Sequence, residues 1–140
     1  MPEARPRLLV FVISYFAETT LRKVLERIPK EIFEAFDAEI LIVDDASTDR
    51  TFEIGHDYRL AHPHIPMTVL RNEHNQGYGG NQKAGYTFAI QRGFDFVAMV
   101  HGDGQYAPEA LPMLCEPLAR RQADAVFGSR FIGRHRCHLF

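Results

Sequence analysis

The chain has 140 residues, of which 46% are hydrophobic and 24% charged, and its formal net charge is −2 with a pI near 6.4. This composition is ordinary for one soluble globular domain, and the slightly acidic balance provides no electrostatic attraction to nucleic acid. No apolar run approaches the ~20 residues of a membrane span, and the two cysteines are too few for a disulfide framework. We therefore expect one soluble domain over residues 1–140, located in a reducing cytoplasmic compartment.

The N-terminal segment has two interpretations, because Arg5 and Arg7 precede the apolar run 8–16 as they would in a signal peptide. No small-residue cleavage site follows this run, and the next segment has the apolar spacing of an amphipathic helix. These two features favour a buried strand over an export signal.

Apolar runs alternate with helical patterns along the rest of the chain. Strands are predicted at residues 8–14, 39–43, 67–70, 94–100 and 123–128. Helices are predicted from Thr19 or Thr20 to Pro29, from 51 to about 61, from about 81 to 92, and from Pro108 onward, where Pro112 and Pro117 shorten or kink the last one. This alternation predicts an α/β fold with a mostly parallel sheet covered by helices on both faces.

Polar clusters follow the first, second and fourth of these strands, at residues 14–18, 44–49 and 101–105, and Arg130 follows the fifth. Right-handed crossovers place the carboxyl ends of parallel strands at one edge of the sheet, where ligands of such sheets bind. The sequence therefore predicts a ligand site at that edge.

The cluster after the fourth strand carries the strongest chemical indication, because an apolar run ends there in a glycine-flanked turn. Asp103 offers a carboxylate and Gln105 a carbonyl oxygen, which suit Mg²⁺ or Mn²⁺ placed between an acidic edge and a diphosphate. His101 adds a nitrogen ligand, or is a loop residue held by hydrogen bonds to the backbone.

The other polar positions each have a functional and a structural interpretation. Asp45 binds the ribose or base of a nucleotide, or forms a turn beside Asp49, which is a candidate helix cap with Ser47 and Thr48. The glycine-rich loop 72–80 is a weak indication of a phosphate cradle. Arg130 pairs with a phosphate or with a surface carboxylate, and the tail 135–138 is a weak indication of metal binding.

Five segments, taken together and in this order, resemble family 2 glycosyltransferases, particularly the dolichol-phosphate mannosyltransferase-like branch. They are VISYFAE at 12–18, VDDASTDRT at 43–51, NQGYGGN at 75–81, HGDGQYAPE at 101–109 and GSRF at 128–131. The resemblance implies a GT-A (Rossmann-like) fold and metal-assisted transfer of a sugar from a GDP- or UDP-sugar donor. It further implies that residues 1–140 are the N-terminal, nucleotide-sugar-binding part of the catalytic domain, apparently truncated at its C-terminus.

The same resemblance assigns the individual site residues. It makes Asp103 the catalytic carboxylate, with His101, Asp103 and Gln105 as ligands of Mg²⁺ or Mn²⁺. The implied nucleotide-contacting set is Ser14, Phe16, Glu18, Val43, Asp45, Gly102 and Arg130. The chain departs from the family pattern where Ser14, Phe16 and Ala17 replace proline, tyrosine and asparagine, and where His101 replaces the first aspartate of D-x-D.

The resemblance also implies the partners. The acceptor is a polyprenyl phosphate or a glycan of the cell envelope, so membrane contact is made only through the acceptor or through segments outside this sequence, at the cytoplasmic face. A sugar-nucleotide pyrophosphorylase is the rival enzyme class, but residues 14–18 lack its glycine-rich, basic loop. A truncated or inactive fragment that binds nucleotide without turnover is the other alternative.

Overall fold

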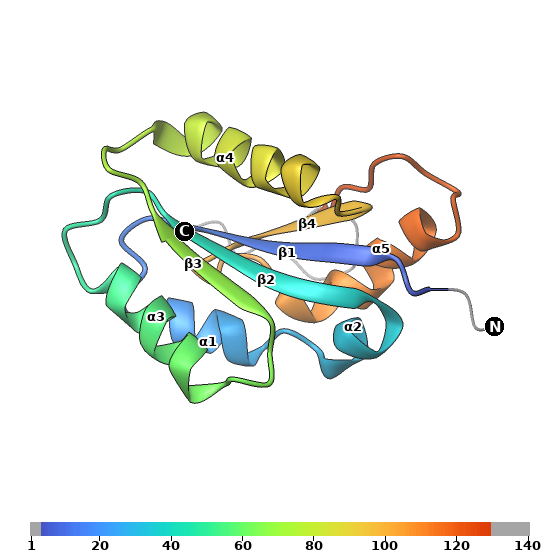
Figure 1. Ribbon diagram of the computed structural model, residues 1–140, viewed down its shortest axis with the longest axis horizontal. Coiled ribbons are helices and arrows are strands. Elements are labelled where there is room, and N and C mark those ends of the chain that lie inside the picture. Colours follow the sequence, from blue (N-terminus) through green and yellow to red (C-terminus); the bar gives the residue numbers. More distant parts are fainter. Residues whose placement is uncertain (1–3, 130–140) are drawn as a thin grey trace.

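Four parallel strands in the order β3-β2-β1-β4 form the sheet of the computed structural model, which describes residues 4–129 (Figure 1). The strands are β1 (Arg7–Ser14), β2 (Asp37–Asp44), β3 (Met67–Arg71) and β4 (Phe96–His101). The helices are α1 (Leu21–Glu26), α2 (Lys30–Ala35), α3 (Thr51–Ala61), α4 (Gly77–Arg92) and α5 (Leu111–Ala119), and a 3-10 turn, η1 (Pro108–Ala110), precedes α5. The predicted parallel α/β fold is therefore confirmed, as are the first four strands with small shifts of their ends.

β1 is a central strand whose alternate side chains enter two separate cores. Leu8, Val10 and Val12 pack against α1, α2, α3 and α5 on one face of the sheet. Leu9, Phe11 and Ile13 pack toward α4 on the other face. Figure 1 shows the same division, with α4 above the sheet and α1, α2 and α3 below it. A strand buried on both faces needs apolar residues at successive positions, which is the continuous pattern seen in the sequence.

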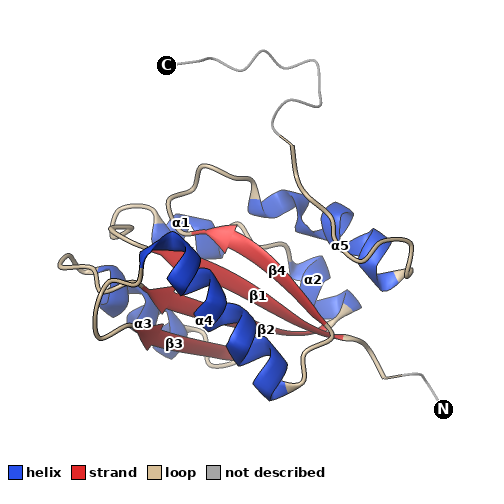
Figure 2. Ribbon diagram, turned by 90° about the horizontal axis from the view of Figure 1, so that it is seen from above, coloured by secondary structure: helices blue, strands red, loops and turns tan. Residues whose placement is uncertain are grey.

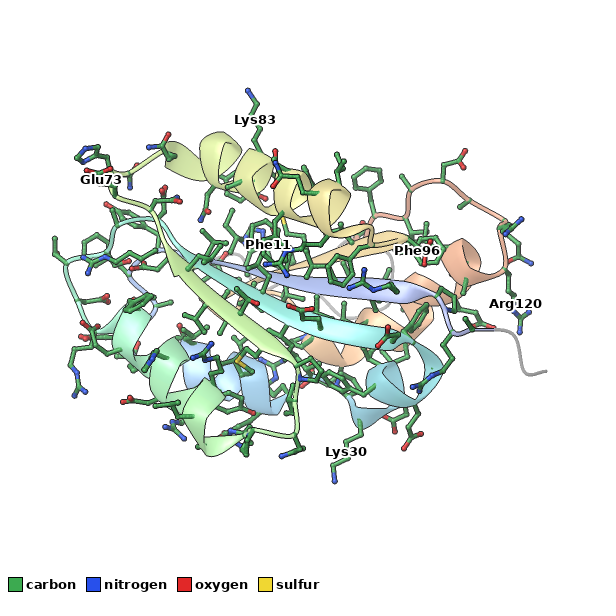
Figure 3. All side chains as sticks on the ribbon, viewed as in Figure 1. Phe11, Lys30, Glu73, Lys83, Phe96 and Arg120 are labelled. Atoms are coloured by element: carbon green, nitrogen blue, oxygen red, sulfur yellow. The ribbon has the colours of Figure 1, made fainter. Side chains whose placement is uncertain are left out.

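The contact between α4 and the sheet is close because Gly85 has no side chain. Phe11 is fully buried between the sheet and α4 (Figure 3), and its ring occupies the space that a Cβ at Gly85 would need. Lys83 projects away from the same helix. One face of α4 therefore packs tightly, although the hydrophobic pattern of this helix is weak.

The predicted fifth strand at 123–128 is wrong, because these residues form neither a strand nor a helix. Residues 124–128 line a cavity of about 530 Å³ together with β4 and α5, so a cavity lies where a hydrogen-bonded ladder to β4 was expected. The Phe127 side chain is 88% exposed. An apolar run becomes a strand only when a neighbouring backbone pairs with it. Here β4 remains the outer strand of the described sheet.

Two helical segments also differ from the predictions. α2 was not predicted, because it has only six residues and one buried side chain, Ile32, and therefore shows little periodicity. α4 begins at Gly77 and not near residue 81, so the glycine-rich loop supplies its first turn. Within residues 4–129, no helix is long and apolar enough to cross a bilayer.

Candidate functional site

The carboxyl ends of β1, β2 and β4 lie side by side at one edge of the sheet, as Figure 2 shows from above. Backbone hydrogen bonds continue the ladder just beyond these ends. The N–H of Asp45 donates to the carbonyl of Ser14 at 2.9 Å, and the N–H of Gly102 donates to that of Ile13 at 2.9 Å. The strand order reverses between β1 and β4, so this edge contains the topological switch point where ligands of α/β sheets bind.

A cavity of about 350 Å³ opens at this position. Five of the predicted site residues line it, namely Ser14, Asp45, His101, Gly102 and Asp103. The sequence alone did not single out the remaining lining residues, which are Ile13, Tyr15, Asn75, Gly77, Tyr78 and Asn81. Four of these lie in the loop 72–80 or at the start of α4, so the weak indication of a ligand cradle in that loop does coincide with the cavity wall.

Ser14 and Gly102 form the floor of the cavity between β1 and β4. Ser14 is 2% exposed, and its Oγ has no hydrogen-bond partner within the described part of the chain. A Cβ built on Gly102 would lie 2.5 Å from this Oγ, which is closer than two such atoms can approach. Gly102 is therefore required for close packing against Ser14, whose buried hydroxyl has no partner among the described residues.

Asp45 organises the opposite wall. It is 3% exposed, and its Oδ1 accepts hydrogen bonds of 2.8 Å from both the backbone N–H of Gln76 and the side-chain amide of Asn72. Asn81, in the first turns of α4, donates to the carbonyl of Val43 at 3.1 Å. Asp45 and Val43 therefore hold the start of α4 against the sheet, and Asp45 also lines the cavity.

Phe16 and Glu18 lie beside the cavity without lining it, where hydrogen bonds join the loop after β1 to the loop after β2. The N–H of Phe16 donates to Ser47 Oγ at 2.9 Å, and Glu18 Oε2 accepts from the N–H of Arg50 at 3.0 Å. Phe16 and Ala46 both have positive φ, at 48° and 60°, in these loops. Strained backbone of this kind persists where surrounding contacts hold it. Direct contact of Phe16 and Glu18 with a nucleotide remains a prediction.

Asp44, the last residue of β2, has a structural role next to these two loops. Its side chain is fully buried, Oδ1 accepts hydrogen bonds from the N–H and hydroxyl of Ser47, and Oδ2 lies 3.7 Å from Arg71 Nε. Burial raises the pKa of Asp44, and the hydrogen bonds from Ser47 and the charge of Arg71 oppose that rise only partly. Asp49 caps α3 from just outside the helix, because its Oδ1 accepts from the N–H of Thr51 at 3.0 Å.

The three predicted metal ligands differ in their surroundings. Asp103 is exposed, and its Oδ1 accepts a hydrogen bond of 3.0 Å from the N–H of Gln105, whose side chain does not line the cavity. His101 Nε2 is 3.1 Å from the hydroxyl of Tyr78, and the His101 ring lies 4.8 Å from the ring of Tyr106. Burial raises the pKa of Tyr78, so its hydroxyl stays protonated at neutral pH and can donate to a neutral imidazole.

The donor set fits a metal ion that is shared with a ligand. Within residues 4–129, no group of three or more His, Cys, Asp or Glu side chains is placed to hold a metal ion by itself. Mg²⁺ commonly binds through one or two carboxylates together with substrate phosphates and water. Asp103 supplies one such carboxylate at the cavity. Arg130 and the tail 135–138, named from the sequence as phosphate and metal candidates, lie outside the described residues.

The sequence is similar to those of two curated proteins. An undecaprenyl-phosphate mannosyltransferase from Micrococcus luteus is 34% identical over 124 residues, which are 89% of this chain and 48% of the relative. A polyprenol monophosphomannose synthase from Mycolicibacterium smegmatis is 29% identical over 126 residues, which are 90% of this chain and 46% of the relative. The chain thus spans about half the length of these curated relatives.

Solved structures share the fold. TarS from S. aureus in complex with UDP-GlcNAc matches with a TM-score of 0.63 and 25% identity, over 84% of this chain and 32% of that one. A Pyrobaculum calidifontis mannosyltransferase in complex with GDP-Man and Mn²⁺ matches with a TM-score of 0.59 and 22% identity, over 78% of this chain and 31% of that one. The sequence profile of "Glycosyl transferase family 2" matches residues 9–136. With its GT-A fold and this match along most of its length, the chain belongs to glycosyltransferase family 2.

Proposed function

We propose that the cavity binds a nucleotide-diphosphate sugar, with GDP or UDP as the nucleotide, and that the chain is the donor-binding part of a glycosyltransferase. The main support is the convergence of Ser14, Asp45 and Asp103 on one cavity at the switch point of a parallel sheet. Family membership supplies the reaction class, which is transfer of a sugar from the donor to an acceptor.

The chemistry of the cavity walls divides the donor between two regions. Ser14, Asp45 and the half-exposed Tyr15 ring offer hydrogen-bonding groups and an aromatic surface, which suit the nucleoside. Asp103 lines the cavity after β4, on the other side of the switch point, and the proposed position of the diphosphate is on that side. This division places the negatively charged phosphates next to the residue proposed to hold the metal.

Mg²⁺ or Mn²⁺ bound by Asp103, with Gln105 and His101 as further candidate ligands, would stabilise negative charge on the leaving diphosphate. The residues of the chain hold and orient the donor. Asp103 would hold the diphosphate end through that ion, and the buried residues Ser14 and Gly102 lie at the base of the proposed donor site. In the reaction, the acceptor oxygen bonds to the anomeric carbon as the bond from that carbon to the diphosphate oxygen breaks.

The proposed acceptor is a polyprenyl phosphate, because the Micrococcus luteus relative is an undecaprenyl-phosphate mannosyltransferase. A glycan of the cell envelope is the alternative acceptor. A lipid-linked acceptor would bring the protein to the cytoplasmic face of a membrane.

A second candidate function is nucleotide binding without turnover. The observation that favours it is that, among the described residues, Asp103 is the one cavity-lining carboxylate after β4, and binding alone requires fewer groups than transfer does.

Thermal unfolding with GDP, UDP or dTDP, each with and without Mn²⁺, tests donor binding. A ligand at ~100 times its dissociation constant stabilises by about 2.7 kcal/mol, which raises the Tm by about 10 °C in a small domain. We expect a metal-dependent rise for one nucleotide, and its loss in Asp103→Ala. Asp57→Ala, which removes an exposed carboxylate on α3, is the matched control and should retain the rise.

If no nucleotide raises the Tm in the presence of metal, the proposed donor site is wrong. If one does, hydrolysis or transfer of the matching nucleotide sugar distinguishes the two candidate functions. Released nucleoside diphosphate supports the transferase, whereas tight binding without release supports the non-catalytic alternative.

A further inference from the structure

One side of α1 lies against the loop that carries Asp103, residues 102–109. Positions 20, 24 and 27 are spaced i, i+4 and i+7, so their side chains leave the helix on the same side. Thr20 hydrogen-bonds Gly102 and Arg27 hydrogen-bonds Glu109, while Val24 Cγ2 lies 3.7 Å from the position that a Cβ of Gly104 would take. These three positions mark the beginning, the turn and the far end of the loop.

The first contact uses a hydroxyl that the sequence suggested as a helix cap. Thr20 does occupy the N-cap position of α1, but its side chain makes no capping hydrogen bond. Its Oγ1 instead donates to the carbonyl of Gly102 at 2.7 Å. Gly102 is buried and directly precedes Asp103, so this bond fixes the peptide from which the carboxylate projects.

The second contact supports the turn itself. Gly104 has φ of +78°, a conformation that glycine adopts without strain, and a Cβ at this position would lie 3.7 Å from Val24 Cγ2. The turn is also closed internally, because Asp103 Oδ1 accepts from the N–H of Gln105 at 3.0 Å. Val24 is buried, so the turn lies next to a side chain of the core.

The third contact closes the far end of the loop. Arg27 donates two parallel hydrogen bonds to the Glu109 carboxylate, Nε to Oε1 at 2.5 Å and Nη2 to Oε2 at 2.9 Å. Arg27 lowers the pKa of Glu109, so the pair stays charged at neutral pH. An exposed pair of this kind adds little to global stability, but its fork geometry restricts where the end of the loop can lie.

We propose that Thr20 and Arg27 are positioning residues, which hold residues 102–109 in place so that Asp103 faces the cavity before the metal or the diphosphate arrives. This inference rests on the proposed function of Asp103. Neither Thr20 nor Arg27 lines the cavity, so both act through the loop. A loop ordered in advance loses less conformational freedom when the ligand binds, and binding is correspondingly tighter.

The test uses Thr20→Val, which keeps the shape but removes the donor, and Thr20→Ser, which restores the donor. Arg27→Ala removes the two hydrogen bonds to Glu109. The control is Lys23→Ala, which removes an exposed cation from the same helix. Amide hydrogen exchange of residues 103–106 is measured in the metal-free protein. Mn²⁺ affinity is measured by electron paramagnetic resonance with GDP or UDP present, and nucleotide affinity is measured without metal.

We expect Thr20→Val and Arg27→Ala to speed exchange of the loop amides and to weaken Mn²⁺ binding by about five-fold, the effect of losing one hydrogen bond. Nucleotide affinity without metal should not change, since neither residue lines the cavity. A general structural defect would instead lower both the Mn²⁺ affinity and the nucleotide affinity. Thr20→Ser and Lys23→Ala should behave as the wild type. If Thr20→Val fails to fold, Arg27→Ala and its control make the same comparison at an exposed site.

Unchanged amide exchange of the loop in Thr20→Val and Arg27→Ala would overturn the inference, whether or not the Mn²⁺ affinity changes. Faster exchange with unchanged Mn²⁺ affinity would overturn it as well, because the loop would then be held without consequence for the site. Failure of the wild type itself to bind Mn²⁺ with either nucleotide would refute the proposed function instead, and the exchange comparison would still decide whether α1 holds the loop.

Discussion

The carboxylate of Asp45 accepts a 2.8 Å hydrogen bond from the backbone N–H of Gln76, so the end of β2 caps the beginning of α4. Gln76 is the N-cap residue of that helix and makes no side-chain capping bond of its own. A negative charge at a helix N-terminus is favourable, because the first N–H groups of the helix are unpaired and carry partial positive charge. One residue therefore shapes the cavity wall and starts the helix above it.

Asp45→Ala should lower the free energy of unfolding by about 1–3 kcal/mol and weaken nucleotide binding, because it leaves the Gln76 N–H and the Asn72 amide without their acceptor. Asp45→Asn keeps an acceptor oxygen and should lose less stability. Urea unfolding and nucleotide titration check both variants. Equal stability of Asp45→Ala and the wild type would contradict the capping role.

Gly102→Ala should destabilise the protein by about 1–3 kcal/mol, because its new methyl group would lie 2.5 Å from Ser14 Oγ. Ser14→Ala removes that oxygen and should therefore recover part of the loss when the two changes are combined. The four proteins of this double-mutant cycle are compared by urea unfolding. Strictly additive changes in the free energy of unfolding would show that the two side chains do not contact each other.

Asp44→Asn tests the raised pKa of the buried carboxyl. A folded-state pKa above the ordinary 3.8 means that the folded state binds the proton more tightly, so the stabilisation from protonation is lost as the pH rises from 3.8 through the raised value. Asparagine does not titrate. The variant should therefore gain stability relative to the wild type across this window, with a constant difference above it.

Urea unfolding from about pH 4 to about pH 8 measures this difference. Asp57→Asn, which makes the same chemical change at an exposed position on α3, is measured beside it as the matched variant. A wild type that gains stability over the variant as the pH rises would mean that the pKa of Asp44 is lowered and not raised.

Cys115 should be inert in the folded protein. It is 2% exposed on α5, and burial raises the pKa of its thiol to about 11, so little thiolate forms at neutral pH. In a Cys137→Ser background, labelling by a disulfide reagent at about pH 8 should occur only when the chain unfolds in urea. Rapid labelling without denaturant would show that α5 does not stay packed against the core.

The strand runs could be predicted from the sequence because strands buried on both faces need continuous apolar residues, as Leu8 and Leu41 illustrate. The segment 123–128 has a similar pattern but no paired neighbour in the structure, and local sequence does not report pairing. The placement of Ser14, Asp45 and Asp103 at one cavity also followed from the sequence, because parallel strands end at the same edge.

The parallel α/β architecture and the edge at which polar residues gather can be read along the chain, since both depend on the periodicity and order of its residues. Which partner each polar group takes depends instead on how the helices pack on the sheet. The Asp45 carboxylate caps α4, and the Thr20 hydroxyl bonds the carbonyl of Gly102 and not its own helix. These pairings join residues distant in sequence, and they form because the packing of helices on the sheet brings unpaired donors and acceptors within reach of one another.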